Sequence, residues 1–298
     1  MNPARDTSFA VTTTALPADL SGMRVIIVGG TGGLGRALSR CVATRGATVH
    51  VVGQTFRDSD LPNVTFTKAD LSLMRVARSV ARELPVEQCD AVVFTTGIFA
   101  APKRQETSEG LELDMAVSYL NRLVMMREIA PRLGKDKPAG SPKPRVFVMG
   151  FPGVNQKGVH VEDLNAKTWY SAMPAHMNTV AGNEMLVLDS VKRYPDVNVY
   201  GLNPGMVKTN IRANFLGEDS FTHRFVEGLL GLFTPTPETY AERIAPLLFA
   251  PELNDRSGAM FNKYGQPARA SPVLVDDPAH VAAFIKASEA LVAEHGGD

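Results

Sequence analysis

A glycine-rich turn between an apolar run and a helical pattern restricts the fold of this chain more than any other feature. The apolar run covers residues 25–28, and the turn Gly-Gly-Thr-Gly-Gly-Leu-Gly follows from Gly29 to Gly35. Such a turn needs glycine because the backbone reverses sharply and approaches a phosphate closely. The next helix would present its positive N-terminal end to the phosphates. Strand, turn and helix in this order predict a dinucleotide site, and the alternative is a tight turn that binds nothing.

Downstream, short β-branched runs alternate with longer helical patterns. This alternation is typical of a parallel sheet covered by helices on both faces. We predict a doubly wound α/β fold of the Rossmann type with a mainly parallel, seven-stranded sheet. The predicted strands are 24–28, 48–52, 64–68, 91–94, 145–149, 197–202 and 259–261. The predicted helices are 34–45, 73–83, 111–133, 177–193, 237–249 and 278–294.

The length of 298 residues suits one large α/β domain. We predict a flexible N-terminal arm over residues 1–20 and a single dinucleotide-binding domain over residues 21–298. A segment rich in Phe and Leu, at about 211–235, interrupts the alternation. It is predicted to form a substrate-binding or lid segment, and core packing of an extra helix pair is the alternative.

Composition excludes several classes of protein. The 31 basic and 31 acidic side chains are interspersed, so a nucleic-acid partner is not expected. Cys41 and Cys89 lie far apart without CxxC spacing, and the histidines lack HxH or HExxH spacing, so we expect no disulfide framework and no metal. Residues 1–19 lack the features of a secretory signal, and no run of about 18 apolar residues predicts a transmembrane segment. These features together favour a cytoplasmic protein.

The spacing of Gly29, Gly33 and Gly35 resembles the turn of the short-chain dehydrogenase/reductases. Further motifs follow in that family's order: Lys-Ala-Asp-Leu-Ser at 68–72, Phe-Thr-Thr-Gly-Ile at 94–98 and Asn-Pro-Gly-Met-Val-Lys-Thr at 203–209. Shorter segments are similar to the retinol dehydrogenase and protochlorophyllide reductase branch, namely 161–165, 169–171, 257–261 and 288–292. The chain is therefore identified as a suspected member of this family and branch.

The resemblance implies a nicotinamide dinucleotide site. Its predicted residues are Gly29, Thr31, Gly33, Leu34, Gly35, Gln54, Arg57, Asp70, Leu71, Thr96, Gly97, Pro204, Gly205, Val207 and Thr209. An acid at the end of the second strand would accept the ribose hydroxyls of NAD, whereas the 2′-phosphate of NADP needs a cation. This strand runs into Gln54 with no acid before Asp58. We predict NADP with Arg57 as a phosphate partner; NAD and a solvated arginine are the alternatives.

The family's proton chemistry uses a Tyr, a Lys four residues later, a Ser and an Asn. In the register that the flanking motifs fix, His176 stands at the Tyr position and Val180 at the Lys position. Gly150 and Phe151 stand where the Ser is expected, and Ser118 stands at the Asn position. The catalytic set is therefore degenerate, because a valine side chain can neither bind ribose hydroxyls nor lower the pKa of a neighbour.

Two side chains remain as candidate proton donors. An imidazole titrates near neutral pH, so His176 is the first candidate for a general acid or base. Tyr170, six residues earlier, is the second. For both residues the alternative is a local packing role.

Three functions stay open. The first is an NADP-dependent oxidoreductase that acts on an apolar carbonyl or alkene substrate with a non-standard proton donor. The second is an isomerase or cyclase with the same fold, and the third is a non-catalytic cofactor-binding or interaction protein. A small-molecule substrate is expected for the enzymes, and an oligomer is possible.

Overall fold

The computed structural model describes residues 3–205 and 235–296. Most of the predicted lid segment at 211–235 lies outside these residues, as do the predicted cofactor residues Val207 and Thr209. Among the described helices, none has both the length and the apolar content needed to cross a bilayer.

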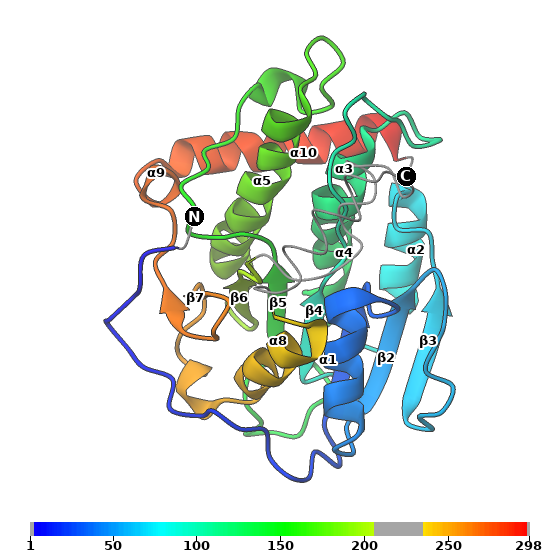
Figure 1. Cartoon of the computed structure of the whole chain (residues 1–298), viewed down its shortest axis with the longest axis vertical. Coiled ribbons are helices and arrows are strands. Elements are labelled where there is room, and N and C mark those ends of the chain that lie inside the picture. Colours follow the sequence, from blue (N-terminus) through cyan, green and yellow to red (C-terminus); the bar gives the residue numbers. More distant parts are fainter. Residues whose placement is uncertain (1–2, 206–234, 297–298) are drawn as a thin grey trace.

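One sheet runs through the middle of the molecule (Figure 1). Its strand order is β3-β2-β1-β4-β5-β6-β7-β8. The strands are β1 Arg24–Val28, β2 Thr48–Gly53, β3 Val64–Lys68, β4 Ala91–Phe94, β5 Arg145–Met149, β6 Asn198–Leu202, β7 Met260–Phe261 and β8 Pro267–Ala268. All neighbours pair in parallel except β7 and β8. The predicted doubly wound α/β fold is confirmed.

Within the described residues the sheet contains all seven predicted strands and one more, β8. The additional strand β8 has only two residues and begins with a proline. Such a segment carries neither the alternation nor the β-branched run by which a strand is recognised. The central strands β4, β5 and β6 are buried along their whole length, which explains their continuous apolar sequences.

Helices cover both faces of the sheet (Figure 1). On one face α1 Gly33–Ala43 packs against α8 Pro237–Ile244. On the other face α2 Met74–Glu83 packs against α4 Asn121–Ile129, and α10 Pro278–His295 packs against α5 Ala172–Arg193. Each face has its own cluster of buried apolar side chains. This two-layer core fixes the strand ends at which the candidate site lies.

The single helix predicted over 111–133 is divided into three elements. They are α3 Leu113–Met115, the π-helical turn η1 Ala116–Leu120 and α4. A π-helical turn contains one extra residue per turn and is found frequently at functional sites. Here it contains Ser118, one of the predicted catalytic residues.

The N-terminal segment, which the sequence predicts as a flexible arm, is fastened to the outer edge of the sheet. Arg5 forms a bridge with Ala268 of β8, and the ring of Phe9 meets that of Phe261 edge-on at 6.4 Å. Farther along, the Glu252 carboxylate accepts hydrogen bonds from the backbone N–H and hydroxyl of Thr12 and Thr13. The single domain over residues 21–298 stays a prediction.

Candidate active site

The predicted cofactor residues within the described chain lie where the parallel strands end. The glycine turn follows β1, Gln54 and Arg57 follow β2, and Asp70 follows β3. Thr96 and Gly97 follow β4, and Pro204 and Gly205 follow β6. Because parallel strands end at one edge, these segments face the crevice at which open α/β sheets bind ligands.

Two glycines of the turn are required by close packing. Gly29 has φ +89°, and a Cβ there would lie 2.7 Å from the backbone nitrogen of Thr96. A Cβ on Gly35 would lie 2.6 Å from the Gly29 carbonyl oxygen. Any side chain at either position would push α1 away from the strands, so these glycines bring the helix N-terminus to the sheet edge.

The middle of the turn faces open space. Gly32 is exposed, and a Cβ there would meet only the Arg57 guanidinium, at 3.8 Å. Gly32 is also the N-cap of α1; within the described chain no side chain caps this end, and the first turn holds no acid. Backbone N–H groups at a helix start bind anions well, so this turn fits the pyrophosphate of a dinucleotide.

The loop after β2 contains one exposed cation and one buried acid. Arg57 is exposed and donates from Nη1 to the Thr31 carbonyl at 2.5 Å, so its guanidinium lies beside the glycine turn. The side chain of Asp58 is only 2% exposed, and it accepts hydrogen bonds from Arg36 at 2.9 Å and Arg40 at 2.8 Å. The nearest acid is thus occupied by α1 and is not presented to a ribose.

The remaining cofactor positions are local turns. Asp70 is exposed and accepts hydrogen bonds from the Ser72 backbone at 3.1 Å and the Ser72 hydroxyl at 2.7 Å. Leu71 is buried, and its carbonyl accepts from the side-chain amide of Asn121 at 3.0 Å. Gly205 has φ +64°, a left-handed conformation that favours glycine after Pro204.

A buried aspartate that the sequence analysis missed joins two predicted catalytic residues. Asp114 is fully buried, and its Oδ2 lies 2.7 Å from Nδ1 of His176. Its Oδ1 accepts a hydrogen bond of 2.5 Å from the Ser118 hydroxyl, which in turn accepts one of 3.0 Å from the Ile98 backbone. One carboxylate therefore holds both His176 and Ser118 in place.

The imidazole of His176 is restricted on its face as well as at its edge. The Phe99 ring stacks on it at 4.0 Å with an interplanar angle of 23°. The His176 side chain is 14% exposed. Because Nδ1 is bonded to Asp114, the neutral ring carries its proton there, and Nε2 is the nitrogen left to exchange a proton with a ligand.

Tyr170 is less suited to proton transfer. Its hydroxyl donates to the Ala101 carbonyl at 2.6 Å. Burial, together with the carboxylates of Glu112 and Asp114, raises the pKa of Tyr170 to about 12. The hydroxyl is therefore a hydrogen-bond donor that fixes a loop.

A buried cation from α4 lies at the ends of β4 and β5. Arg122 is 3% exposed and donates to the Met149 carbonyl at 2.5 Å, to Asn183 Oδ1 at 2.7 Å and to the Thr96 carbonyl. Burial lowers the pKa of Arg122 to about 9, so the guanidinium remains charged at neutral pH. Val180 is buried nearby on α5. The sequence signal for Arg122 was a charged residue inside an apolar helix.

Metal-ligating side chains do not gather in the described parts of the chain. Over residues 3–205 and 235–296, no group of three His, Cys, Asp or Glu side chains could hold a metal ion. Cys41 and Cys89 are both free thiols.

Known proteins resemble the chain in sequence and in fold. An uncharacterized oxidoreductase of Saccharomyces cerevisiae is 48% identical over 278 residues, which cover 92% of this chain and 89% of the yeast protein. Retinol dehydrogenase 11 of Mus musculus is 22% identical and covers 82% of the chain, with 78% of its own length matched. No family model matches the chain.

Two solved structures have the same fold. A short-chain dehydrogenase/reductase from Serratia marcescens superposes with a TM-score of 0.60 at 19% identity, covering 83% of this chain and 98% of that one. BdcA in complex with NADPH gives a TM-score of 0.58 at 18% identity, covering 85% of this chain and 98% of BdcA.

Fold, glycine turn and relatives together define the class. The chain belongs to the short-chain dehydrogenase/reductase family of NAD(P)-binding oxidoreductases. The predicted similarity to the retinol dehydrogenase branch is also confirmed.

Proposed function

We propose that this protein is an NADP(H)-dependent oxidoreductase that uses His176, oriented by Asp114, as its proton donor and acceptor. The observation that carries this proposal is the 2.7 Å contact between His176 Nδ1 and the buried Asp114 carboxylate. A carboxylate at Nδ1 fixes the tautomer and the ring orientation and stabilises the imidazolium. These are the properties that a general acid or base needs.

The division of labour follows from the groups present. A bound nicotinamide would supply or accept the hydride. As the imidazolium, His176 would donate a proton from Nε2 to the substrate oxygen or carbon in reduction; as the neutral ring, it would accept one at Nε2 in oxidation. Ser118 would keep the Asp114 carboxylate from turning away, because its hydroxyl occupies Oδ1.

An apolar carbonyl or alkene is the proposed substrate class. The stacked Phe99 ring forms an apolar wall beside His176, and the side chain of Met173, in the first turn of α5, is 50% exposed. A polarised alkene needs less acid assistance than a ketone at the moment of hydride transfer, which would suit a site without the family's Tyr and Lys.

We propose NADP as the cofactor in preference to NAD. Asp58 is buried against Arg36 and Arg40, so it cannot serve as the ribose-binding acid of an NAD site. Arg57 lies beside the glycine turn with its side chain exposed. Its guanidinium would pair with a 2′-phosphate.

A cytoplasmic location is proposed on the weaker ground that Cys41 and Cys89 are unpaired. A small-molecule substrate is proposed from the family. An oligomeric assembly stays a prediction.

The first experiment is a calorimetric titration with NADPH and NADH, followed by a hydride-transfer screen of carbonyls and enones. In His176→Phe we expect kcat to fall by about 10²- to 10⁴-fold, the usual contribution of a general acid or base, with NADPH affinity unchanged. His160→Phe is the control, because His160 also packs against an aromatic ring, that of Trp169, with ring centroids 4.3 Å apart and the rings tilted by 33°.

Three results would argue against this proposal. Unchanged turnover in His176→Phe would remove the assigned role of His176. Binding of NADPH without hydride transfer to any substrate would favour a non-catalytic cofactor-binding protein. Conversion of a substrate without net oxidation or reduction would favour an isomerase or cyclase.

A further inference from the structure

A second buried carboxylate lies two residues before Asp114. Glu112 is 2% exposed and is the N-cap residue of α3. Its Oε2 accepts a hydrogen bond from the Met115 backbone at 2.7 Å, and its Oε1 accepts one from the Asp114 backbone at 3.2 Å. Glu112 therefore holds the same peptide segment that carries the Asp114 side chain.

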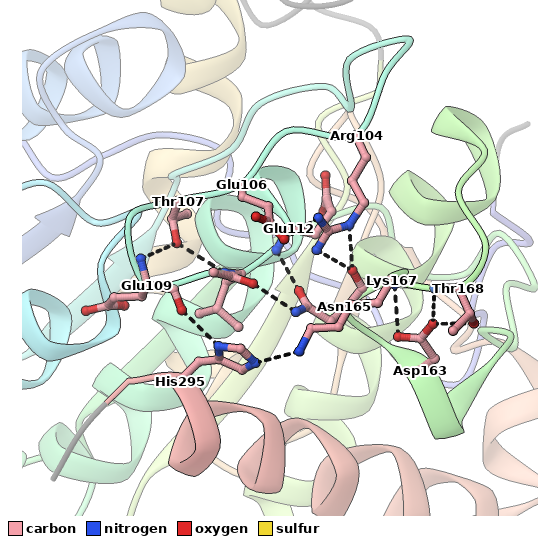
Figure 2. Close-up of polar contacts among 12 residues, drawn as sticks. Arg104, Glu106, Thr107, Glu109, Glu112, Asp163, Asn165, Lys167, Thr168 and His295 are labelled. Atoms are coloured by element: carbon pink, nitrogen blue, oxygen red, sulfur yellow. Dashed lines mark hydrogen bonds and ion pairs between the residues drawn. The ribbon is translucent and has the colours of Figure 1, made fainter.

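The backbone of Glu112 is held from another part of the chain. Its N–H donates to Oδ1 of Asn165 at 2.7 Å, and the side-chain amide of Asn165 donates to the Gly110 carbonyl at 2.9 Å. Arg104 donates from Nε and Nη2 to the Asn165 carbonyl at 3.1 and 3.0 Å. Figure 2 shows Arg104, Glu112 and Asn165 converging where the loop after β4 meets the turn that precedes α5.

We propose that Glu112, held by Asn165, is a positioning residue that fixes Asp114 and thereby sets the orientation of His176. This inference rests on the proposed function of His176. Glu112 touches neither His176 nor a reacting atom in this arrangement; it acts through the two backbone N–H bonds. The hydrogen bond from the Glu112 N–H to Asn165 ties the same segment to the turn at residues 163–168.

The charges around Glu112 make its role dependent on pH. Burial, together with the nearby Asp114 charge, raises the pKa of Glu112 to about 7 against the opposing effect of the backbone N–H bonds and Arg104. Tyr170 faces the same two carboxylates, and Arg122 faces Asp114. Near neutral pH, Glu112 therefore changes between a neutral and an anionic cap directly beside Asp114.

The chain provides a matched control three residues earlier. Glu109 belongs to the same loop, and the exposed fraction of its side chain is 8%. Its carboxylate also accepts two backbone hydrogen bonds, from Met74 at 2.6 Å and Arg75 at 3.3 Å. Those bonds hold the start of α2, where none of the catalytic candidates lies. A general loss of loop structure would affect both glutamates, whereas a positioning role concerns Glu112 alone.

The test compares Glu112→Ala, Glu112→Gln and Glu109→Ala with the full-length protein. We expect Glu112→Ala to lower kcat by about ten- to a hundredfold, the scale on which small misplacements of a catalytic group act, without changing NADPH affinity. Glu112→Gln carries no charge and keeps only one of the two acceptor oxygens, so we expect a kcat between those of the parent and Glu112→Ala, without the step near pH 7 in the kcat profile. Glu109→Ala should leave both kcat and its pH profile as in the parent protein.

A readout without cofactor separates this inference from the proposed function. The titration of the His176 ring, followed by NMR, should shift in Glu112→Ala and stay in place in Glu109→Ala. An unchanged titration together with unchanged kcat in Glu112→Ala would overturn the positioning role. Turnover that survives His176→Phe would overturn the proposed function instead, while the NMR titration would still decide whether Glu112 positions Asp114.

Discussion

At the scale of single residues, we propose that two side chains in the loop after β2 select the dinucleotide. The side chain of Asp58 is turned into ion pairs with α1, whereas Arg57 remains exposed beside Gly32. Asp58 lies five residues past the end of β2, and its burial removes it from competition for the ribose hydroxyls. Arg57 is therefore the group that we propose meets the cofactor.

For Arg57→Gln we expect weaker binding of NADPH by about ten- to a hundredfold and unchanged binding of NADH, because one charge-assisted bond to a 2′-phosphate is worth about 1.5–3 kcal/mol. Parallel calorimetric titrations of variant and parent at equal ionic strength measure the difference. Arg75→Gln, on the exposed surface of α2, is the control for general charge loss. Equal weakening for both cofactors would mean that Arg57 supports the turn through the Thr31 carbonyl and does not select the phosphate.

The candidate site was predictable from sequence only where motifs flank it. The motifs that flank His176 place it at the family's Tyr position, and the pattern of the long predicted helix places Ser118 at the Asn position. Asp114 was missed because it lies 62 residues from His176 and stands within an otherwise helical, apolar pattern. Burial and hydrogen-bond partners, which identify such a residue, depend on the packing of α3 against α5.

At the scale of elements, the first strand, turn and helix form one unit. The turn allows α1 to begin directly behind β1, since Gly29 and Gly35 touch backbone and side chains that a Cβ would displace. The exposed Gly32 belongs to the same turn but has no such neighbour. Gly29 and Gly35 are thus needed for packing, whereas we expect Gly32 to face the ligand.

Gly35→Ala should therefore destabilise the fold, by about 1–3 kcal/mol as expected for overpacking, and should weaken NADPH binding with it. Chemical denaturation measures the first effect and calorimetry the second. Gly32→Ala is the paired variant, with a smaller effect on stability because its Cβ would face open space. Equal loss of stability in the two variants would contradict this division of the turn.

Strands and long helices were predictable because their periodicity is local. All seven predicted strands were found within one residue of their observed bounds, and four of them, 24–28, 64–68, 91–94 and 145–149, have the same bounds. The π-helical turn η1 and the short strand β8 were not predictable, since one is a variation of hydrogen bonding inside a helical pattern and the other exists only by pairing with β7.

At the scale of the whole molecule, the N-terminal segment and the last strands hold one another. Glu252 receives four hydrogen-bond donors from Thr12 and Thr13, which lower its pKa to about 2. A carboxylate with a depressed pKa stabilises the folded state above its unfolded value of about 4.5, and that contribution disappears as the pH falls toward 2.

Glu252→Gln should accordingly lower the free energy of unfolding at pH 7 by less than about 1 kcal/mol, since the Glu252 carboxylate lies close to solvent and its charge is screened. At pH 3 we expect variant and parent to differ less. Urea denaturation at both pH values measures this, and Glu162→Gln, an exposed acid elsewhere, is the control. A difference that grows on acidification would have the wrong sign for the role given to Glu252.

The bridge between Arg5 and Ala268 joins nearly opposite ends of the chain. Because protein synthesis proceeds from the N-terminus, the first residues must wait unpaired until the last strands have left the ribosome. Until then the outer edge of the growing sheet has no partner, and an open strand edge invites pairing with other chains. The newly made protein is therefore exposed to aggregation at this edge until β8 has been synthesised, and the docking of the segment around Arg5 then covers the edge.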